Sequence, residues 1–183
     1  MSIKGIFFDL YGNLLGYGVK KQAWNDWLAT FYDQLTAQGL NSSRAAFSQA
    51  CDGFFNAAAP AGKDGHLTEL ERRIQRLCAA LDHQSDPASL RDIADRIAAA
   101  WQSHVSIDPE AMPVLMDLKQ RNKTLGLVSN FDHPPHVRRI LSENGWATVF
   151  DTIVISSEVG VKKPDPAIFA IALQRTGIAP GDA

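Results

Sequence analysis

The chain has little of what would assign it to a secreted, membrane or nucleic-acid-binding class. Its two cysteines, Cys51 and Cys78, are too few for the disulfide framework of a small secreted protein, so we expect both to be reduced and packed on helices. No segment approaches the roughly 20 apolar residues that span a bilayer, and the first apolar stretch is too short for a signal peptide. The formal net charge of −2 gives no overall attraction to nucleic acid or acidic lipid. We therefore expect a cytoplasmic protein whose partner is neither nucleic acid nor a membrane.

What the sequence does contain begins with a pattern of alternating strands and helices. Three short apolar segments are each closed by polar or turn residues, and helical patterns follow them. The predicted strands cover about 3–8, 124–128 and 152–155, and the predicted helices about 109–122, 135–144 and 166–176. Continuous apolar strands joined by helices are typical of a parallel sheet that is covered on both faces. The predicted fold class is therefore α/β, with a Rossmann-like parallel sheet.

A purely helical stretch interrupts this pattern. Between about residues 20 and 101 apolar residues recur at helical spacing in four stripes, with no strand between them. Asn41 and Asp86 are predicted to cap the second and fourth helices, the latter with Pro87 at the first helical position. We expect an α/β core formed by residues 1–16 and 107–183 and a helical domain formed by residues 17–106, whose Trp and Phe residues are mainly core.

Polar groups follow each predicted strand. Asp9 ends the first, Ser129 and Asn130 the second, and Ser156 and Ser157 the third, with Lys163 a few residues beyond. Because ligands bind outside the carboxyl ends of parallel strands, these side chains are expected to converge on one rim.

The residue types predict a different chemical role for each of these side chains. A carboxylate at Asp9 can attack an electrophile and form a covalent ester, and an ammonium group at Lys163 would stabilise negative charge nearby. The hydroxyl and backbone N–H groups of Ser129 and Asn130 would hold an oxyanion, and Gly12 would let backbone amides approach it. The structural alternatives are a turn residue at Asp9 and a surface lysine at Lys163.

Two histidines also follow the second strand. His133 and His136 would contact substrate under one interpretation, but Asp132-His133-Pro134-Pro135 is equally a helix-start loop.

Three segments carry a resemblance to a known family. Residues Phe7–Leu14, Leu127–Asp132 and Ser157–Pro166 resemble, in order and spacing, the first three motifs of the haloacid dehalogenase superfamily of hydrolases. The helical stretch stands where members with a cap inserted after the first motif carry it. The resemblance implies that Asp9 is the nucleophile, that Ser129 and Asn130 position the transferred group, that the loop residues Tyr11, Gly12 and Asn13 contact substrate, and that Lys163 supplies positive charge.

The motifs point to two different reactions. Superfamily phosphatases usually carry a general-acid aspartate two residues after the nucleophile; Tyr11 stands there, as it does in 2-haloacid dehalogenases, and a halide leaves without a proton. The second and third motifs, however, are of the phosphatase form. Dehalogenases usually place an arginine early in the cap, and here the first arginine after Asp9 is Arg44. Asn13 replaces the threonine that is usual in both groups.

Metal use depends on which of these reactions applies. In the phosphatase form, the Asp9 carboxylate and the Tyr11 backbone carbonyl would bind Mg²⁺ together with carboxylates of a fourth motif; the dehalogenase form needs no cofactor. That fourth motif would follow Ala183, so we expect this chain to lack the C-terminal strand and helix of the core. The expected function is a hydrolase acting on a small organic substrate through an aspartyl-enzyme intermediate, dehalogenase-type by its first motif. The alternatives are a Mg²⁺-dependent phosphomonoesterase and a catalytically impaired relative that binds a partner. Oligomeric state and substrate identity stay open.

Overall fold

The computed structural model describes residues 3–58 and 66–183, and these form two compact units. One unit, here the core unit, comprises Met1–Tyr17 and Val105–Ala183. The other, the helical unit, comprises Gly18–His104.

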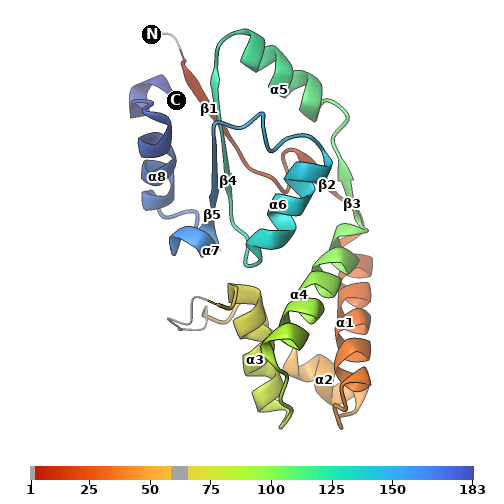
Figure 1. The fold of residues 1–183 in the computed structure, drawn as a ribbon. Coiled ribbons are helices and arrows are strands. Elements are labelled where there is room, and N and C mark those ends of the chain that lie inside the picture. Colours follow the sequence, from red (N-terminus) through yellow and green to blue (C-terminus); the bar gives the residue numbers. More distant parts are fainter. Residues whose placement is uncertain (1–2, 59–65) are drawn as a thin grey trace. The chain divides into compact units, whose positions relative to one another are not determined.

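The core unit is built on a three-stranded parallel sheet with the order β1-β4-β5 (Figure 1). The strands are β1 (Gly5–Phe8), β4 (Thr124–Ser129) and β5 (Thr152–Ile155). Phe8 pairs with Leu127 and Ser129 pairs with Ile155. Because the strands are parallel and in this register, the residues that follow them emerge at the same edge of the sheet. The predicted α/β class with a parallel sheet is confirmed.

Helices cover both faces of this sheet (Figure 1). They are α5 (Ala111–Gln120), α6 (Pro134–Glu143), the short α7 (Ser156–Val159) and α8 (Ala167–Thr176), followed by a 3₁₀ turn at Pro180–Asp182. Leu125 and Leu127 of β4 pack in the cluster that contains residues of α5 and α6, whereas Val128 packs with β5 and α8. Successive side chains of a strand point to opposite faces, so an unbroken apolar run in β4 is what burial on both faces requires.

A second, two-stranded sheet in the core unit was not expected from the sequence. Strand β2 (Leu15–Tyr17) pairs antiparallel with β3 (Val105–Ile107), nearly 90 positions further along the chain. Both strands are only three residues long, and β3 leaves its side chains largely exposed, so neither carries the alternation that identifies a strand. They lie directly beside the points where the chain passes between the units.

The helical unit consists of α1 (Lys20–Ala37), α2 (Arg44–Ala50), α3 (Glu69–Ala80) and α4 (Pro87–Gln102). The side chain of Asp86 accepts hydrogen bonds from the first backbone N–H groups of α4, as predicted. The prediction for α2 was wrong by two residues, because Ser43 rather than Asn41 caps it and accepts from Ala46 N. Both are good capping residues, and tertiary packing decides between two such neighbours.

Aromatic and aliphatic side chains from all four helices form the core of the helical unit. Its largest buried members include Trp27, Phe31, Phe47 and Ile74. Cys51 and Cys78 lie in the same cluster as free thiols, as predicted, and burial raises the pKa of Cys51 to about 12. None of the helices in residues 3–58 and 66–183 is long and apolar enough to cross a membrane.

Gly126 in the middle of β4 is the position where the sheet tolerates a side chain least. A Cβ there would overlap the ring of Phe7 and lie 3.1 Å from the Cγ2 of Thr152. We expect Gly126→Ala to lower the free energy of unfolding by about 1–3 kcal/mol, the cost of inserting a methyl group into a packed core. Urea denaturation would measure this. Gly181→Ala is the matched control, because nothing lies within 4 Å of its added Cβ, and an equal loss in both variants would contradict the packing argument.

Candidate active site

Asp9 stands directly after β1, at the edge where all three strands of the parallel sheet end. Its Oδ1 accepts a hydrogen bond from the backbone N of Leu10 at 2.8 Å, and 43% of its side chain is exposed. The chain then turns sharply: Gly12 adopts a positive φ of 81° and donates from its backbone N to Leu15 O at 2.7 Å. Glycine takes this conformation without strain, so the loop can close immediately after Asp9. The carboxylate is therefore fixed in direction and open to solvent on one side.

Lys163, far from Asp9 in the sequence, forms an ion pair with it. Its Nζ lies 2.6 Å from Asp9 Oδ2 and donates to the backbone carbonyl of Val128 at 2.9 Å. Only 21% of the lysine side chain is exposed, whereas the neighbouring Lys162 is exposed. Of the two adjacent lysines, Lys163 is thus the one that the structure brings to Asp9. A partly buried ammonium group held by two oxygens places a fixed positive charge beside the carboxylate.

Ser129 ends β4 at the same edge of the parallel sheet, and its side chain is buried. The residue is 1% exposed, and within the described part of the chain its Oγ has no hydrogen-bond partner. A buried hydroxyl without a partner carries an energetic cost, which functional sites often retain. An unused hydrogen-bond donor therefore lies at the carboxyl end of β4.

The side chain of Asn130 bonds to the backbone of Lys163. Its Oδ1 accepts from the backbone N of Lys163 at 2.8 Å, and its Nδ2 donates to the backbone O of Lys163 at 2.9 Å. The side-chain oxygen and one N–H of the amide are thus already bonded to the loop that carries Lys163. The expected role of the backbone N–H in holding the transferred group stays a prediction.

A column of stacked aromatic rings lies next to Asp9. The ring of Tyr11 is sandwiched between Tyr17, at 6.1 Å, and Phe131, at 5.3 Å between centroids. Burial raises the pKa of Tyr11, and both burial and the charge of Asp9 raise the pKa of Tyr17. Both phenols are therefore neutral near pH 7. Two positions after Asp9, the site presents an apolar ring with a neutral hydroxyl in place of a second carboxylate.

Tyr17 belongs to this column but was not predicted from the sequence. Its ring also lies 3.5 Å from where a Cβ on Gly12 would be, so it covers the loop after Asp9. The only signal available was its closeness in sequence to the first motif. Its position depends on the unexpected strand β2.

The other predicted side chains lie at the margin of the site or in the core. Asn13 is exposed on the loop after Gly12. His133 and His136 are buried at the start of α6, where His136 stacks on Phe131 and its Nδ1 lies 3.0 Å from Arg139 Nη2. This placement matches the helix-start interpretation of the two histidines, since neither ring is exposed to a ligand.

The donors around Asp9 do not meet the needs of Mg²⁺. Magnesium prefers six oxygens in octahedral geometry and commonly takes one or two carboxylates with water and substrate oxygens. Within residues 3–58 and 66–183, no group of three or more His, Cys, Asp or Glu side chains is placed to hold a metal ion. Both oxygens of Asp9 already accept bonds, from Leu10 N and Lys163 Nζ. Asp9 and the Tyr11 carbonyl alone do not fit a complete magnesium site.

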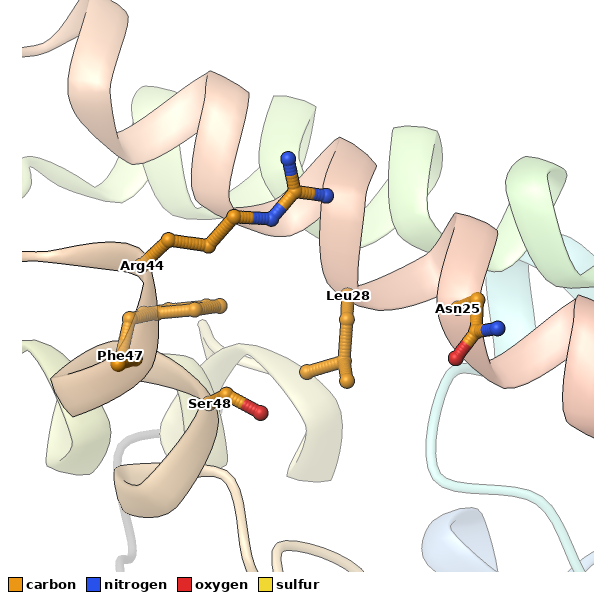
Figure 2. A pocket seen from close by; sticks show the side chains of 6 residues that line it. Asn25, Leu28, Arg44, Phe47 and Ser48 are labelled. Carbon is orange, nitrogen blue, oxygen red and sulfur yellow. The ribbon is translucent and has the colours of Figure 1, made fainter.

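Arg44, the first arginine after Asp9, lines a hollow within the helical unit. The hollow has a volume of about 580 Å³ and lies between α1 and α2, where Asn25, Leu28, Phe47 and Ser48 also border it (Figure 2). The Arg44 guanidinium lies 5.9 Å from the centre of the Tyr32 ring. This contact within the helical unit accounts for the position of Arg44 without a role in the reaction.

Comparison with known proteins decides the family. The family model for haloacid dehalogenase-like hydrolases matches residues 3–183. The chain belongs to this family. It is 32% identical over 151 residues to haloacid dehalogenase-like hydrolase domain-containing protein 3 from Danio rerio, covering 78% of this chain and 58% of that protein.

Curated relatives of this chain include phosphatases, and a solved dehalogenase structure shares its fold. Over 75 residues the chain is 40% identical to phosphoserine phosphatase from Thermus thermophilus, which covers 41% of this chain and 30% of that protein. The crystal structure of a 2-haloacid dehalogenase from Pseudomonas syringae pv. tomato superimposes with a TM-score of 0.62 at 22% identity, covering 99% of this chain and 76% of that one. The chain thus spans between about a third and three fifths of the length of these curated relatives. The comparisons establish membership of this family and leave the substrate class undecided.

Proposed function

We propose that this chain hydrolyses a small organic substrate through a covalent ester formed on Asp9. The observation that carries the proposal is the 2.6 Å ion pair between Asp9 Oδ2 and Lys163 Nζ at the carboxyl edge of the parallel sheet. Ser129, at the end of the neighbouring strand β4, adds a buried hydroxyl that has no hydrogen-bond partner within the described residues. A directed nucleophile, a fixed cation and a free donor are the three parts that such a displacement needs.

The proposed reaction has two steps. A carboxylate oxygen of Asp9 attacks the electrophilic atom of the substrate, forming an ester bond while the leaving group departs with the electron pair of the broken bond. Water then attacks the ester or acyl-phosphate, which releases the hydroxylated product or inorganic phosphate and restores the carboxylate with loss of a proton to solvent. Lys163 offsets the negative charge of substrate and transition state throughout, and Ser129 donates to a substrate oxygen.

Tyr11 supports a carbon–halogen substrate such as a 2-haloacid. A halide needs no proton to leave, whereas an alkoxide leaves efficiently only with one. Tyr11 has its ring stacked on both faces and a raised pKa, so it is a poor proton donor. An apolar ring at this position also suits the carbon chain of a small haloacid.

A phosphomonoester is the second candidate substrate, favoured by the sequence of the second and third motifs. The stretch of 75 residues that is 40% identical to phosphoserine phosphatase supports the same candidate. Under this proposal Asp9 and the Tyr11 carbonyl would hold Mg²⁺ only together with the carboxylates of a fourth motif.

A substrate screen with and without EDTA separates these proposals. The purified chain would be incubated with 2-chloropropionate and with small phosphate esters, and released halide and phosphate would be measured. We expect halide release that EDTA leaves unchanged. Phosphate release that EDTA abolishes would instead assign the phosphatase reaction. No turnover of either class, together with measurable binding of the same compounds, would support the impaired relative and refute the hydrolytic proposal.

A further inference from the structure

We propose that Asn130 is a positioning residue that acts on the reaction through Lys163, and that it does not bind the substrate through its side-chain oxygen. The inference rests on the proposed function of the Asp9–Lys163 pair. Two hydrogen bonds of opposite direction, at 2.8 and 2.9 Å, join the Asn130 amide to the backbone N–H and C=O of Lys163.

This pair of bonds occupies most of what the amide offers. A neutral carboxamide has one acceptor oxygen and two N–H donors, and Lys163 takes the oxygen and one donor. Asn130 thereby imitates the backbone of a neighbouring strand at a point where β4 has already ended at Ser129. The loop that carries Lys163 gains a fixed register on the sheet edge.

The same register places the ammonium group. With its backbone held by Asn130, the Lys163 side chain reaches back to Val128 O at 2.9 Å and Asp9 Oδ2 at 2.6 Å. Val128 of β4 thus accepts from the Lys163 ammonium group, while Asn130, which follows the strand, bonds to the Lys163 backbone. Both the backbone and the ammonium group of Lys163 are therefore held by hydrogen bonds, as a preorganised charge requires.

A second contact supports the same segment. The backbone N of Phe131 donates to Ser156 Oγ at 3.1 Å, and Ser156 is buried at the end of β5. The segments after β4 and after β5 are therefore joined by side-chain–backbone bonds at two successive residues, Asn130 and Phe131. Of the two, the Asn130 contact is the one that reaches Lys163 directly.

A double-mutant cycle tests whether Asn130 acts through Lys163. Asn130→Ala should lower kcat by roughly 10- to 100-fold with little change in KM, because a displacement of about 1 Å at a reacting group has an effect of this size. In a Lys163→Ala background, the same substitution should change kcat by less than about twofold. Asn130→Asp keeps the acceptor for Lys163 N–H but loses the donor to Lys163 O, so it should not reach the activity of the unaltered chain. Losses that multiply in the double variant would overturn the proposal, because they would place Asn130 on the substrate.

Hydrogen exchange at the Lys163 amide gives a readout that needs no activity. Loss of one hydrogen bond of ordinary net strength should speed exchange of this N–H by about fivefold in Asn130→Ala, and much less in Asn130→Asp. Asn144→Ala is the control, since it removes a side-chain bond to Ile140 O elsewhere in the core unit and should leave the Lys163 amide unchanged. An unchanged Lys163 amide in Asn130→Ala would refute the inference, whereas faster exchange in a chain without turnover would refute only the proposed function.

Discussion

Replacing Asp9 with asparagine is expected to lower kcat by at least about 10³-fold while leaving the fold intact. The amide keeps the size of the carboxylate and can still accept from Leu10 N, but it is a poor nucleophile and has no charge for Lys163 to pair with. Because 43% of the Asp9 side chain is exposed, the lost ion pair should cost no more than about 1 kcal/mol of stability. Steady-state kinetics and thermal unfolding of the same preparation would measure both quantities.

The control for Asp9 is another exposed aspartate with a similar local bond. The Oδ1 of Asp108 accepts from Glu110 N at 2.9 Å in the core unit, so Asp108→Asn should keep full activity. Turnover in water enriched in ¹⁸O adds a direct test, since hydrolysis of an ester on Asp9 places the label in that carboxylate. Full activity in Asp9→Asn, or label absent from Asp9 after many turnovers of a 2-haloacid, would remove this residue from the mechanism; with a phosphate ester the label is expected in the released phosphate instead.

Replacing Lys163 with alanine is expected to reduce kcat/KM by about 10²- to 10³-fold. This is the usual loss when one preorganised charge or donor beside a reacting group is removed. Unlike Asp9→Asn, the variant keeps its nucleophile, so a residual rate should persist. Single-turnover measurements of the first step should show both the lower rate of Lys163→Ala and its residual activity.

Lys162→Ala is a closely matched control for this experiment. The two lysines are adjacent, but Lys162 is exposed, whereas Lys163 is held by Asp9 and Val128. We expect the Lys162 variant to behave like the unaltered chain. Equal losses in the two variants would show that only the general charge of the loop matters, and would contradict a specific role for Lys163.

The parallel sheet and the meeting of Asp9 with Lys163 could be predicted because they depend on local patterns. A strand buried on both faces leaves an unbroken apolar run in the sequence, and its first polar residue marks the edge where ligands bind. The parallel register then carries Asp9 and Ser129 to the same edge whatever the loops between them do. Lys163 needed the resemblance of its motif as well, since a surface lysine has the same local pattern.

The details that escaped prediction depend on contacts between distant segments. Strands β2 and β3 are three residues each and are defined only by their pairing with each other. The two bonds of Asn130 are made to a backbone 33 positions away, and its residue type is equally suited to a ligand. The stacking of Tyr17 on Tyr11 depends on strand β2, so it could not be predicted without that strand.

The unbonded hydroxyl of Ser129 lowers the stability of the fold, although the proposed reaction uses it. A folded chain that leaves this buried donor without a bond is less stable than one without the donor, so alanine, which removes the hydroxyl, is the residue that heat alone would favour. A ligand oxygen that accepts from the hydroxyl removes the penalty as it binds. Relatives from hot environments would therefore retain serine at this position only while the reaction is under selection.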